Sequence, residues 1–357
     1  MTSQKNKTPV ASWLDYDFLA EEQRAVKCLT VILRTRGCRW RKCRMCGFWH
    51  ESADPSLTQA DLLTQLEQAL ERHSPDEDFI LKIFTSGSFL DEREISGETR
   101  RKIAETVRRR RRQGRTKGRR RGGIKKLLVE TRPEFVSEEK IKDLKVVEGL
   151  ELAFGLETAD DFIRSNYINK GFSFEDFRNA AKVAKKSGAS VKTYLLLKPP
   201  FVSEKKAIQD AVKSADLVAP YSSTISLNLC NVQRQTALEG LWRRKFYRPP
   251  WLWSAVEVLK TVKKKRGEGL VLLSDPVGGG HKRGPHNCGK CDAAVVRAIK
   301  KFNRTQDLSV LERLDESEAT TAETAAEAEC ECKGVWCALL KFDDFLFGSN
   351  PPSSTLP

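Results

Sequence analysis

Three cysteines stand close together near the N-terminus, in the basic string GCRWRKCRMCGF. Cys38, Cys43 and Cys46 follow the spacing C-x4-C-x2-C, and thiolates at such short spacing bind metals or take part in redox chemistry. The next cysteine is Cys230, which lies in an apolar run and is typical of a packed core thiol. The string therefore offers three soft ligands, since Cys28, the cysteine before them, also lies in an apolar run and is typical of a packed core thiol.

The number of ligands limits the metal chemistry of this triplet. A two-iron ferredoxin cluster and a structural zinc ion both take four protein ligands. His50 could complete a zinc site as C-x4-C-x2-C-x3-H, and this alternative stays open. Three thiolates can instead hold three irons of a four-iron cluster and leave one iron free for a substrate or cofactor, which would indicate catalysis.

A second group of cysteines lies toward the C-terminus. Its two close pairs are Cys288 with Cys291, and Cys330 with Cys332. Two pairs of thiolates predict a four-coordinate zinc site, with a second iron–sulfur cluster as the alternative. His286 or Cys337 could replace one ligand. Such a site would tie together chain segments that are distant in sequence and would contribute folding free energy.

The elements that must position these residues follow from the hydrophobic pattern. Apolar, β-branched runs alternate with amphipathic charged segments. The expected strands are Lys27–Arg34, Phe79–Ser86, Ile124–Thr131, Leu150–Glu157, Ser190–Lys198 and Thr224–Asn231. The expected helices are Thr58–Arg72, Glu98–Arg112, Ser137–Leu144, Ser173–Ser187 and Glu204–Val218. This alternation predicts an α/β fold with a parallel sheet of right-handed βα units.

An unusual polar segment follows every expected strand. In order these are the cysteine triplet, TSGSF, ETRPEF, GLETADD, KPPF and NVQRQT. Loops at the carboxyl ends of barrel strands converge on one face and carry the active site, whereas a flat sheet joins only those at its switch point. Six such loops in succession favour a partial (β/α)6 barrel.

The pattern changes beyond about residue 235, where tryptophans and a double proline precede a glycine-rich segment. We expect an N-terminal extension at 1–24, a partial barrel at 25–235 and a smaller C-terminal metal-binding module at 236–357. An acidic insertion at about 315–329 would interrupt that module.

The formal net charge of +15 indicates a polyanionic partner such as nucleic acid. Residues 108–121 supply ten of the basic side chains and form either a phosphate-gripping arm or a solvated insertion. No apolar run has the roughly 18 residues of a membrane helix, and the N-terminus lacks the apolar core of a signal peptide. We therefore expect a cytoplasmic protein without membrane contact, in which ten cysteines do not form a disulfide framework.

The triplet and the loops after the strands resemble the radical S-adenosylmethionine (SAM) superfamily over residues 25–235. In that superfamily three thiolates hold a 4Fe-4S cluster, SAM chelates the open iron, and an electron from a donor cleaves SAM to a 5′-deoxyadenosyl radical. The spacing here is one residue longer than the commonest C-x3-C-x2-C, and TSGS stands where many members carry Gly-Gly-Glu. The resemblance implies that Cys38, Cys43 and Cys46 hold the catalytic cluster.

The same resemblance implies SAM contacts by position at the strand ends. The serine-glycine loop would meet the amino group of SAM, and the charged residues would meet its ribose or carboxylate. The expected contacts are Ser86, Gly87, Ser88, Glu130, Arg132, Glu157 and Lys198.

Longer strings are more specific and are similar to the archaeal family of archaeosine biosynthesis radical SAM proteins. They are ILRTRGCRWRKCRMCGFW, GLETADDFIRSNYINKGFSFEDF, YLLLKPPFVSEKKAI, SLNLCNVQRQT, LWRRKFYRPPWLWSAVEVL and LLSDPVGGGHKRGPHNCGKCD. The likeness runs over nearly the whole chain, apart from the basic stretch near Arg115 and the acidic insertion.

This resemblance implies a lyase that acts on tRNA with a partner subunit. The partner, the lysine-adding archaeosine synthase subunit, attaches lysine to 7-cyano-7-deazaguanine at position 15. The radical enzyme would then take a hydrogen from the lysine side chain beside that nitrogen and cleave the carbon–nitrogen bond. Archaeosine would remain in the tRNA, and the rest of lysine would leave as an aldehyde-type product.

Substrate contacts are expected from the later loops. Basic residues gripping the RNA would include Arg243, Arg244, Arg248, Lys282 and Arg283. Asn228, Gln233 and Arg234 are expected nearest the modified base or its lysine, and His281 and His286 could serve in proton transfer. Two alternatives stay open: another radical SAM enzyme of tRNA modification, such as an elongator-like one, and a non-catalytic zinc-containing RNA-binding protein.

Overall fold

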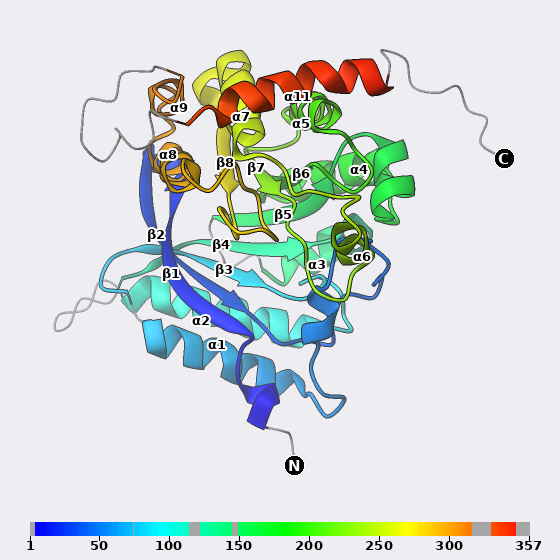
Figure 1. Ribbon diagram of the computed structural model, residues 1–357. Coiled ribbons are helices and arrows are strands. Elements are labelled where there is room, and N and C mark those ends of the chain that lie inside the picture. The colour runs from blue at the N-terminus through cyan, green and yellow to red at the C-terminus, as the bar shows by residue number, and fades with distance from the viewer. Residues whose placement is uncertain (1–3, 74, 114–121, 145–148, 316–329, 348–357) are drawn as a thin grey trace.

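One eight-stranded sheet organises the chain in the computed structural model, which describes residues 4–73, 75–113, 122–144, 149–315 and 330–347. Its strands follow one another in sequence order: β1 (Ala11–Leu19), β2 (Arg24–Ile32), β3 (Phe79–Phe84), β4 (Ile124–Thr131), β5 (Leu150–Glu157), β6 (Ser190–Leu197), β7 (Thr224–Leu229) and β8 (Val271–Asp275). β1 pairs antiparallel with β2, and every later pair is parallel. The sheet curves into a nearly closed barrel (Figure 1).

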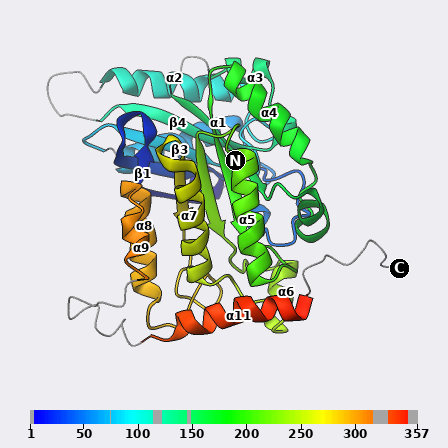
Figure 2. The same ribbon diagram turned by 90° about the horizontal axis from the view of Figure 1, so that it is seen from above.

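Helices cover the outside of this barrel (Figures 1 and 2). The α-helices are α1 (Gln59–His73), α2 (Gly97–Gln113), α3 (Glu138–Lys142), α4 (Phe174–Lys186), α5 (Glu204–Val218), α6 (Ala237–Arg243), α7 (Leu252–Arg266), α8 (Asp292–Thr305), α9 (Ser309–Glu312) and α11 (Cys332–Phe347). Short turns of other helix types are η1 (Gln4–Lys7), η2 (Ala20–Glu22), η3 (Phe48–Glu51), η4 (Pro133–Phe135), η5 (Ile163–Ile168) and η6 (Gly267–Gly269). None of the described helices is long and apolar enough to cross a membrane.

The six expected strands and five expected helices are confirmed, with ends that shift by at most three residues. Local sequence chemistry explains where several begin. Ser173 forms a capping box with Asp176 at the start of α4, and Ser137 accepts a hydrogen bond from the Lys140 amide at the start of α3. Because these caps satisfy free amides at the helix start, the sequence defines where α3 and α4 begin.

Two strands were not expected, and each owes its place to pairing with a neighbour. The middle of β1 is solvent-exposed from Trp13 to Tyr16, so it lacks the alternation of a half-buried strand. β8 has only five residues and pairs with β7. The division at residue 235 stays a prediction, although β8, from beyond that point, lies in the same sheet. Residues 114–121 of the basic stretch and 316–329 of the acidic insertion lie outside the described residues.

The two faces of the sheet have opposite character. The outward face buries alternate residues such as Leu127, Val129 and Leu152 against the helices in the main hydrophobic core. The inward face is polar: Lys82 on β3 and Lys192 on β6 lie 2.5 and 3.7 Å from the Asp17 carboxylate on β1. Since β1 and β6 are not neighbours in the sheet, these ion pairs cross the inside of the barrel.

Candidate active site at the carboxyl ends of the strands

The triplet loop follows β2 and lies directly against the loop after β3. The Cys38 amide donates to the Ser86 carbonyl oxygen at 3.0 Å. A Cβ at Gly87 would lie 2.6 Å from the Cys38 Cα, so only glycine permits this approach. The Ser88 hydroxyl in turn accepts the Arg132 amide at 3.1 Å. The loops after β2, β3 and β4 therefore pack against one another.

Loops from the other side of the barrel hold the triplet loop as well. The Trp40 indole donates to the Asn169 carbonyl oxygen at 2.6 Å. A Cβ at Gly171, whose φ is +79°, would lie only 2.4 Å from the Trp40 ring. Gln233, expected near the substrate, accepts the Gly47 amide at 2.5 Å through its side-chain oxygen. Segments after β2, β5 and β7 thus meet at the cysteines, as a barrel requires.

Glu94 positions this junction and was missed from the sequence. Its carboxylate accepts the Thr35 hydroxyl at 2.5 Å and the Ser88 amide at 2.6 Å, and so joins the loops after β2 and β3. Burial raises the pKa of Glu94 to about 7, against the effect of these two hydrogen bonds. Nothing in the string LDEREI distinguishes it from the acidic residues at 91 and 92.

Two buried cations lie near the thiol of Cys43. Burial raises the pKa of Cys43 to about 11, and the charges of Lys170 and Arg132 oppose that rise. Lys170 pairs with Glu157 at 2.6 Å, and both side chains are largely buried. The Arg132 guanidinium lies over the Trp40 ring at 5.6 Å. These cations favour the thiolate form that a metal cluster needs.

One atom of this cation group is left without a partner among the described residues. The Nη2 of Arg132 is buried and makes no hydrogen bond, although the Nε donates to Glu134 at 2.5 Å. A buried unpaired donor is costly and calls for an acceptor. Three thiols beside an unsatisfied guanidinium fit an anionic cluster together with a carboxylate-bearing cofactor, the donor set of a 4Fe-4S cluster that binds SAM.

The triplet is not arranged around a single metal ion. Within the described residues, one group of His, Cys, Asp or Glu brings three or more ligand atoms within 4.8 Å of one another, and it is the C-terminal cysteine group. A tetrahedral ion with metal–sulfur bonds of about 2.3 Å needs its ligand atoms that close. This geometry weighs against the zinc site with His50 that the sequence left open.

Glu130, expected to contact SAM, lies at the end of β4 on the inward face. It is within hydrogen-bonding reach of the Tyr194 hydroxyl on β6. Burial raises the pKa of Glu130 to about 7, against the effect of Tyr194. Both side chains, and that of Asn228 on β7, stay partly exposed between fully buried neighbours. They line the inside of the barrel just below the cysteine loop.

Lys198 lies at the end of β6 and already has a partner. Its ammonium is 2.6 Å from the carboxylate of Glu204, which is buried. Its carbonyl oxygen accepts the Tyr247 hydroxyl at 2.8 Å, and its φ is +59°. In this arrangement Lys198 fixes the loop after β6, and its contact with SAM stays a prediction.

The expected substrate residues divide into tethered and exposed ones. The Arg283 guanidinium donates to the Val232 carbonyl oxygen at 3.1 Å and pairs with Glu239 at 3.0 Å. The Nδ1 of His286 lies 2.8 Å from the Gly284 carbonyl oxygen. Arg234 and His281 are solvent-exposed. The tethered side chains fix the glycine-rich loop, and their roles toward substrate stay predictions.

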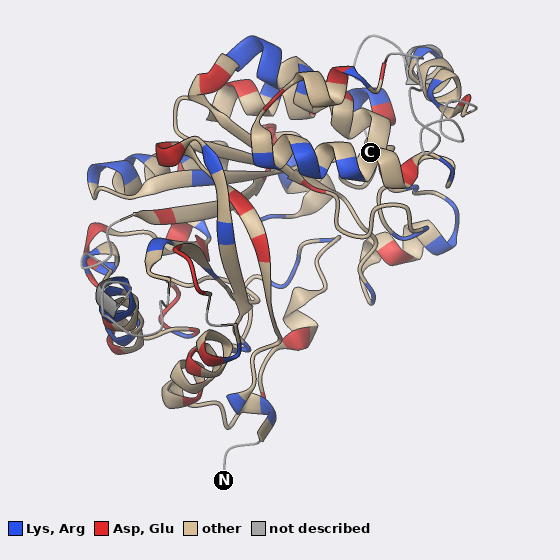
Figure 3. Cartoon of the chain, turned by 90° about the vertical axis from the view of Figure 1, so that its left-hand side faces the viewer, with Lys and Arg blue, Asp and Glu red and all other residues tan. Residues whose placement is uncertain are grey.

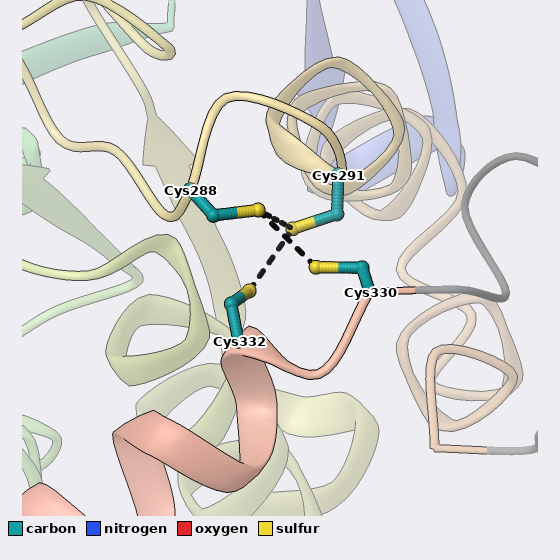
Figure 4. A group of neighbouring side chains, drawn as sticks. All are labelled: Cys288, Cys291, Cys330 and Cys332. Carbon is teal, nitrogen blue, oxygen red and sulfur yellow. Dashed lines mark hydrogen bonds between the residues drawn. The ribbon is translucent and has the colours of Figure 1, made fainter.

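The four C-terminal cysteines point toward one another (Figure 4). Cys288 lies 3.2 Å from Cys330, and Cys291 lies 3.4 Å from Cys332, between sulfur atoms. Asn287 and Trp253 donate N–H groups to the sulfurs of Cys291 and Cys332 at 3.3 and 3.2 Å, as second-layer donors at metal thiolates do. The described group contains neither His286 nor Cys337, so four thiols alone complete the expected ligand set.

Comparisons with known proteins identify the superfamily. Residues 32–211, which are 180 of the 357 residues, match the family model described as the radical SAM superfamily. The matched span begins in β2 and ends in α5, so it contains the cysteine triplet and the loops that pack on it.

Curated relatives narrow the comparison. The archaeosine synthase subunit beta of Methanosarcina acetivorans is 44% identical over 96% of this chain and 92% of its own length. The protein of the same name from Thermococcus kodakarensis is 44% identical over 80% of this chain and 87% of its own. A tRNA uridine(34) acetyltransferase from Methanocaldococcus jannaschii is 24% identical over 38% of this chain and 25% of its own.

Proposed function

Because this chain belongs to the radical SAM superfamily and to the family of archaeosine synthase beta subunits, we propose that it completes archaeosine in tRNA. The proposed reaction is cleavage of the lysine carbon–nitrogen bond of lysine-modified 7-cyano-7-deazaguanine at position 15. The chain is a radical SAM enzyme of tRNA modification, and the bond and the position are what the proposal adds.

The observation that carries the proposal is a set of three thiols where the loops of the barrel meet. Among the described residues, no fourth ligand joins them around a single ion. When bound, a 4Fe-4S cluster and SAM together supply a hydrogen-abstracting 5′-deoxyadenosyl radical. Cys38, Cys43 and Cys46 would hold that cluster. Lys170 and Arg132 would balance its negative charge, since both already act electrostatically on Cys43.

The polar residues around the cysteines would divide the work of binding. The loop Ser86–Ser88, held against Cys38, would receive the amino group of SAM. The unpaired Nη2 of Arg132 would receive a carboxylate. Glu130 and Asn228, on the inward face below the cysteines, would orient the lysine side of the substrate.

We assign zinc to the C-terminal cysteine group, because four thiols at these spacings suit a closed tetrahedral site. Cys288 and Cys291 precede α8, whereas Cys330 precedes α11 and Cys332 begins it. The ion would therefore fasten α11, which packs on α5, to the body of the barrel. Its proposed role is structural, and a second cluster is the alternative that elemental analysis would reveal.

The proposed partners are tRNA, the lysine-adding archaeosine synthase subunit and an electron donor. The cytoplasmic location stays a prediction. The alternative of another radical SAM enzyme of tRNA modification has weaker support. The relative that modifies another tRNA position, the tRNA uridine(34) acetyltransferase, matches little more than a third of this chain. The non-catalytic zinc alternative has weaker support as well, because the triplet is not gathered around one ion among the described residues.

The test is SAM cleavage by the anaerobically reconstituted, reduced protein. We expect a brown protein that forms 5′-deoxyadenosine, and more of it with lysine-modified tRNA than with unmodified tRNA. Cys43→Ala should abolish both the colour and the product, and Cys337→Ser, a change at an exposed cysteine outside both sites, should preserve them. Cleavage that ignores the lysine modification would refute the substrate while leaving the superfamily intact.

A further inference from the structure

Three aromatic rings form a continuous cluster beside the cysteine loop, and two of them are exposed. Phe162 and Tyr167 follow β5, and Phe201 follows β6. The ring centres of Phe162 and Tyr167 are 5.4 Å apart, and those of Tyr167 and Phe201 are 5.7 Å apart, both in edge-to-face geometry. Yet Phe162 is 61% exposed and Phe201 is 55% exposed. Phe162 and Phe201 therefore leave more than half of their surface to solvent, and the partly buried ring of Tyr167 lies between them.

The backbone beneath two of these rings adopts unfavourable or rare conformations. Phe201 has a φ of +65°, where the Cβ of a bulky residue crowds the backbone and glycine would fit without strain. Tyr167 lies in η5, a turn of π-helix, a conformation that is rare and concentrated at functional sites. The strained backbone of Phe201 does not bury its ring, so the stability of the fold does not explain the strain. Such strain indicates a functional role for the exposed ring.

Positive charge adjoins the ring cluster. The Arg44 amide donates to the Ile168 carbonyl oxygen at 2.9 Å, and its guanidinium donates to the Asn166 carbonyl oxygen, so the cysteine loop is fastened to η5. That loop contains six Lys or Arg and no acidic residue between positions 34 and 48, and Arg41 and Lys42 are exposed. In the view of Figure 3, Lys and Arg are interspersed with Asp and Glu along the helices and strands.

We infer that Phe162, Tyr167 and Phe201 form a stacking platform for an unpaired RNA base, with the basic cysteine loop contacting the adjoining phosphates. Aromatic side chains beside basic residues are the usual means of binding unstacked nucleotides. An enzyme that acts on a base inside a folded RNA must extrude that base. A platform at the carboxyl ends of the barrel strands would replace the stacking that the base loses in the RNA. This inference rests on the proposed function only in taking tRNA as the RNA.

The test measures tRNA binding by the full-length protein together with its thermal unfolding. Phe201→Gly removes the ring and relieves the strained φ. Since stacking on one side chain contributes about 1–3 kcal/mol, we expect tRNA binding to weaken roughly 5- to 150-fold. The unfolding temperature should not fall, because glycine accepts this conformation freely. Phe162→Ala should weaken tRNA binding similarly. Phe201→Tyr, which keeps an aromatic ring, should bind tRNA as tightly as the parent.

Two comparisons separate stacking from charge and from misfolding. Tyr16→Ala removes a ring that is 46% exposed on β1, opposite Lys27 of β2, and should leave tRNA binding unchanged. Lys42→Gln, a change at an exposed residue of the cysteine loop, should reduce the salt dependence of binding by about one phosphate contact, whereas Phe201→Gly should leave that slope unchanged.

The outcomes distinguish this inference from the proposed function. If the parent protein binds tRNA and the ring variants bind it equally well, the platform is refuted and the proposed function stands. If the parent does not bind tRNA, the proposed function itself fails. Ring variants that keep tRNA binding but lose copurification with the lysine-adding subunit would show a protein interface instead, and would overturn the inference.

Discussion

Gly87→Ala is the change that tests the geometry of the cysteine loop most sharply. A Cβ at this position would lie 2.6 Å from the Cys38 Cα and 2.7 Å from its amide nitrogen, where 3.4 Å is the lower limit of ordinary contact. Both atoms belong to backbone, so neither can rotate away. The loops after β2 and β3 must therefore separate by about 1 Å to admit the methyl group, as overpacking generally requires.

The expected consequences differ for stability and for catalysis. Overpacking of this kind costs about 1–3 kcal/mol of unfolding free energy. Displacing Cys38 by about 1 Å from its two partner cysteines should reduce SAM cleavage by roughly 100-fold, because reactive geometry tolerates little misplacement. Gly87→Ala should also lower the iron bound per chain after reconstitution.

Gly240→Ala is the matched control. Gly240 lies in α6, and a Cβ there would meet nothing within 4 Å. Alanine favours a helix over glycine by about 1 kcal/mol, so this variant should be slightly stabilised and fully active. The assays are thermal unfolding, iron content and 5′-deoxyadenosine formation. A Gly87→Ala protein with parental iron content and SAM cleavage would refute the packing argument.

Three further predictions concern stability. The Cys330→Ser variant should unfold at a lower temperature than the parent protein. Chelation of the bound metal should lower the unfolding temperature of the parent but have little further effect on the variant. Asp17→Asn leaves two buried lysines unpaired and should cost about 3–5 kcal/mol in denaturant unfolding, whereas Asp15→Asn on the exposed stretch of β1 should be nearly neutral. Burial tends to raise the pKa of Asp17, but the charges of these two lysines outweigh it and hold the pKa below its usual range. The contribution of the Asp17 carboxylate to the unfolding free energy should therefore be lost as the pH falls below about 3.8. Glu94 has the opposite sign: burial raises its pKa from 4.5 to about 7, the folded chain binds the extra proton, and stability should fall as the pH rises across that interval. Glu94→Gln should remove this part of the pH dependence, and an unchanged slope between pH 5 and 8 would contradict it.

Local pattern was enough to predict the strands β2 to β7 and to single out the two cysteine groups, whose metal binding stays a prediction. Each parallel strand from β2 to β7 is a β-branched or leucine-rich run that is buried on its outward face, so it stands out against the charged helices. The cysteines are informative because thiols at such spacing have few other roles. Cys288 and Cys330, distant in sequence, indeed lie 3.2 Å apart between sulfur atoms.

Features that depend on contacts between distant segments could not be predicted. Lys170 is one lysine among many in the sequence, and its proximity to Cys43 results from the way the loop after β5 folds back. The positive φ of Phe201 leaves no trace in the string KPPF, since phenylalanine there suggests no left-handed turn. β1 has an exposed centre, and only its partner β2 makes it a strand.

The proposed reaction is cleavage of the lysine carbon–nitrogen bond on a modified base in tRNA. The most direct measurement is analysis of the nucleoside at position 15 after lysine-modified tRNA is incubated with the reduced, cluster-loaded protein and SAM. Archaeosine should appear as the lysine-modified nucleoside disappears, and neither change should occur without SAM or with Cys43→Ala. A cluster-loaded protein that cleaves SAM yet leaves the lysine-modified nucleoside intact would contradict the account.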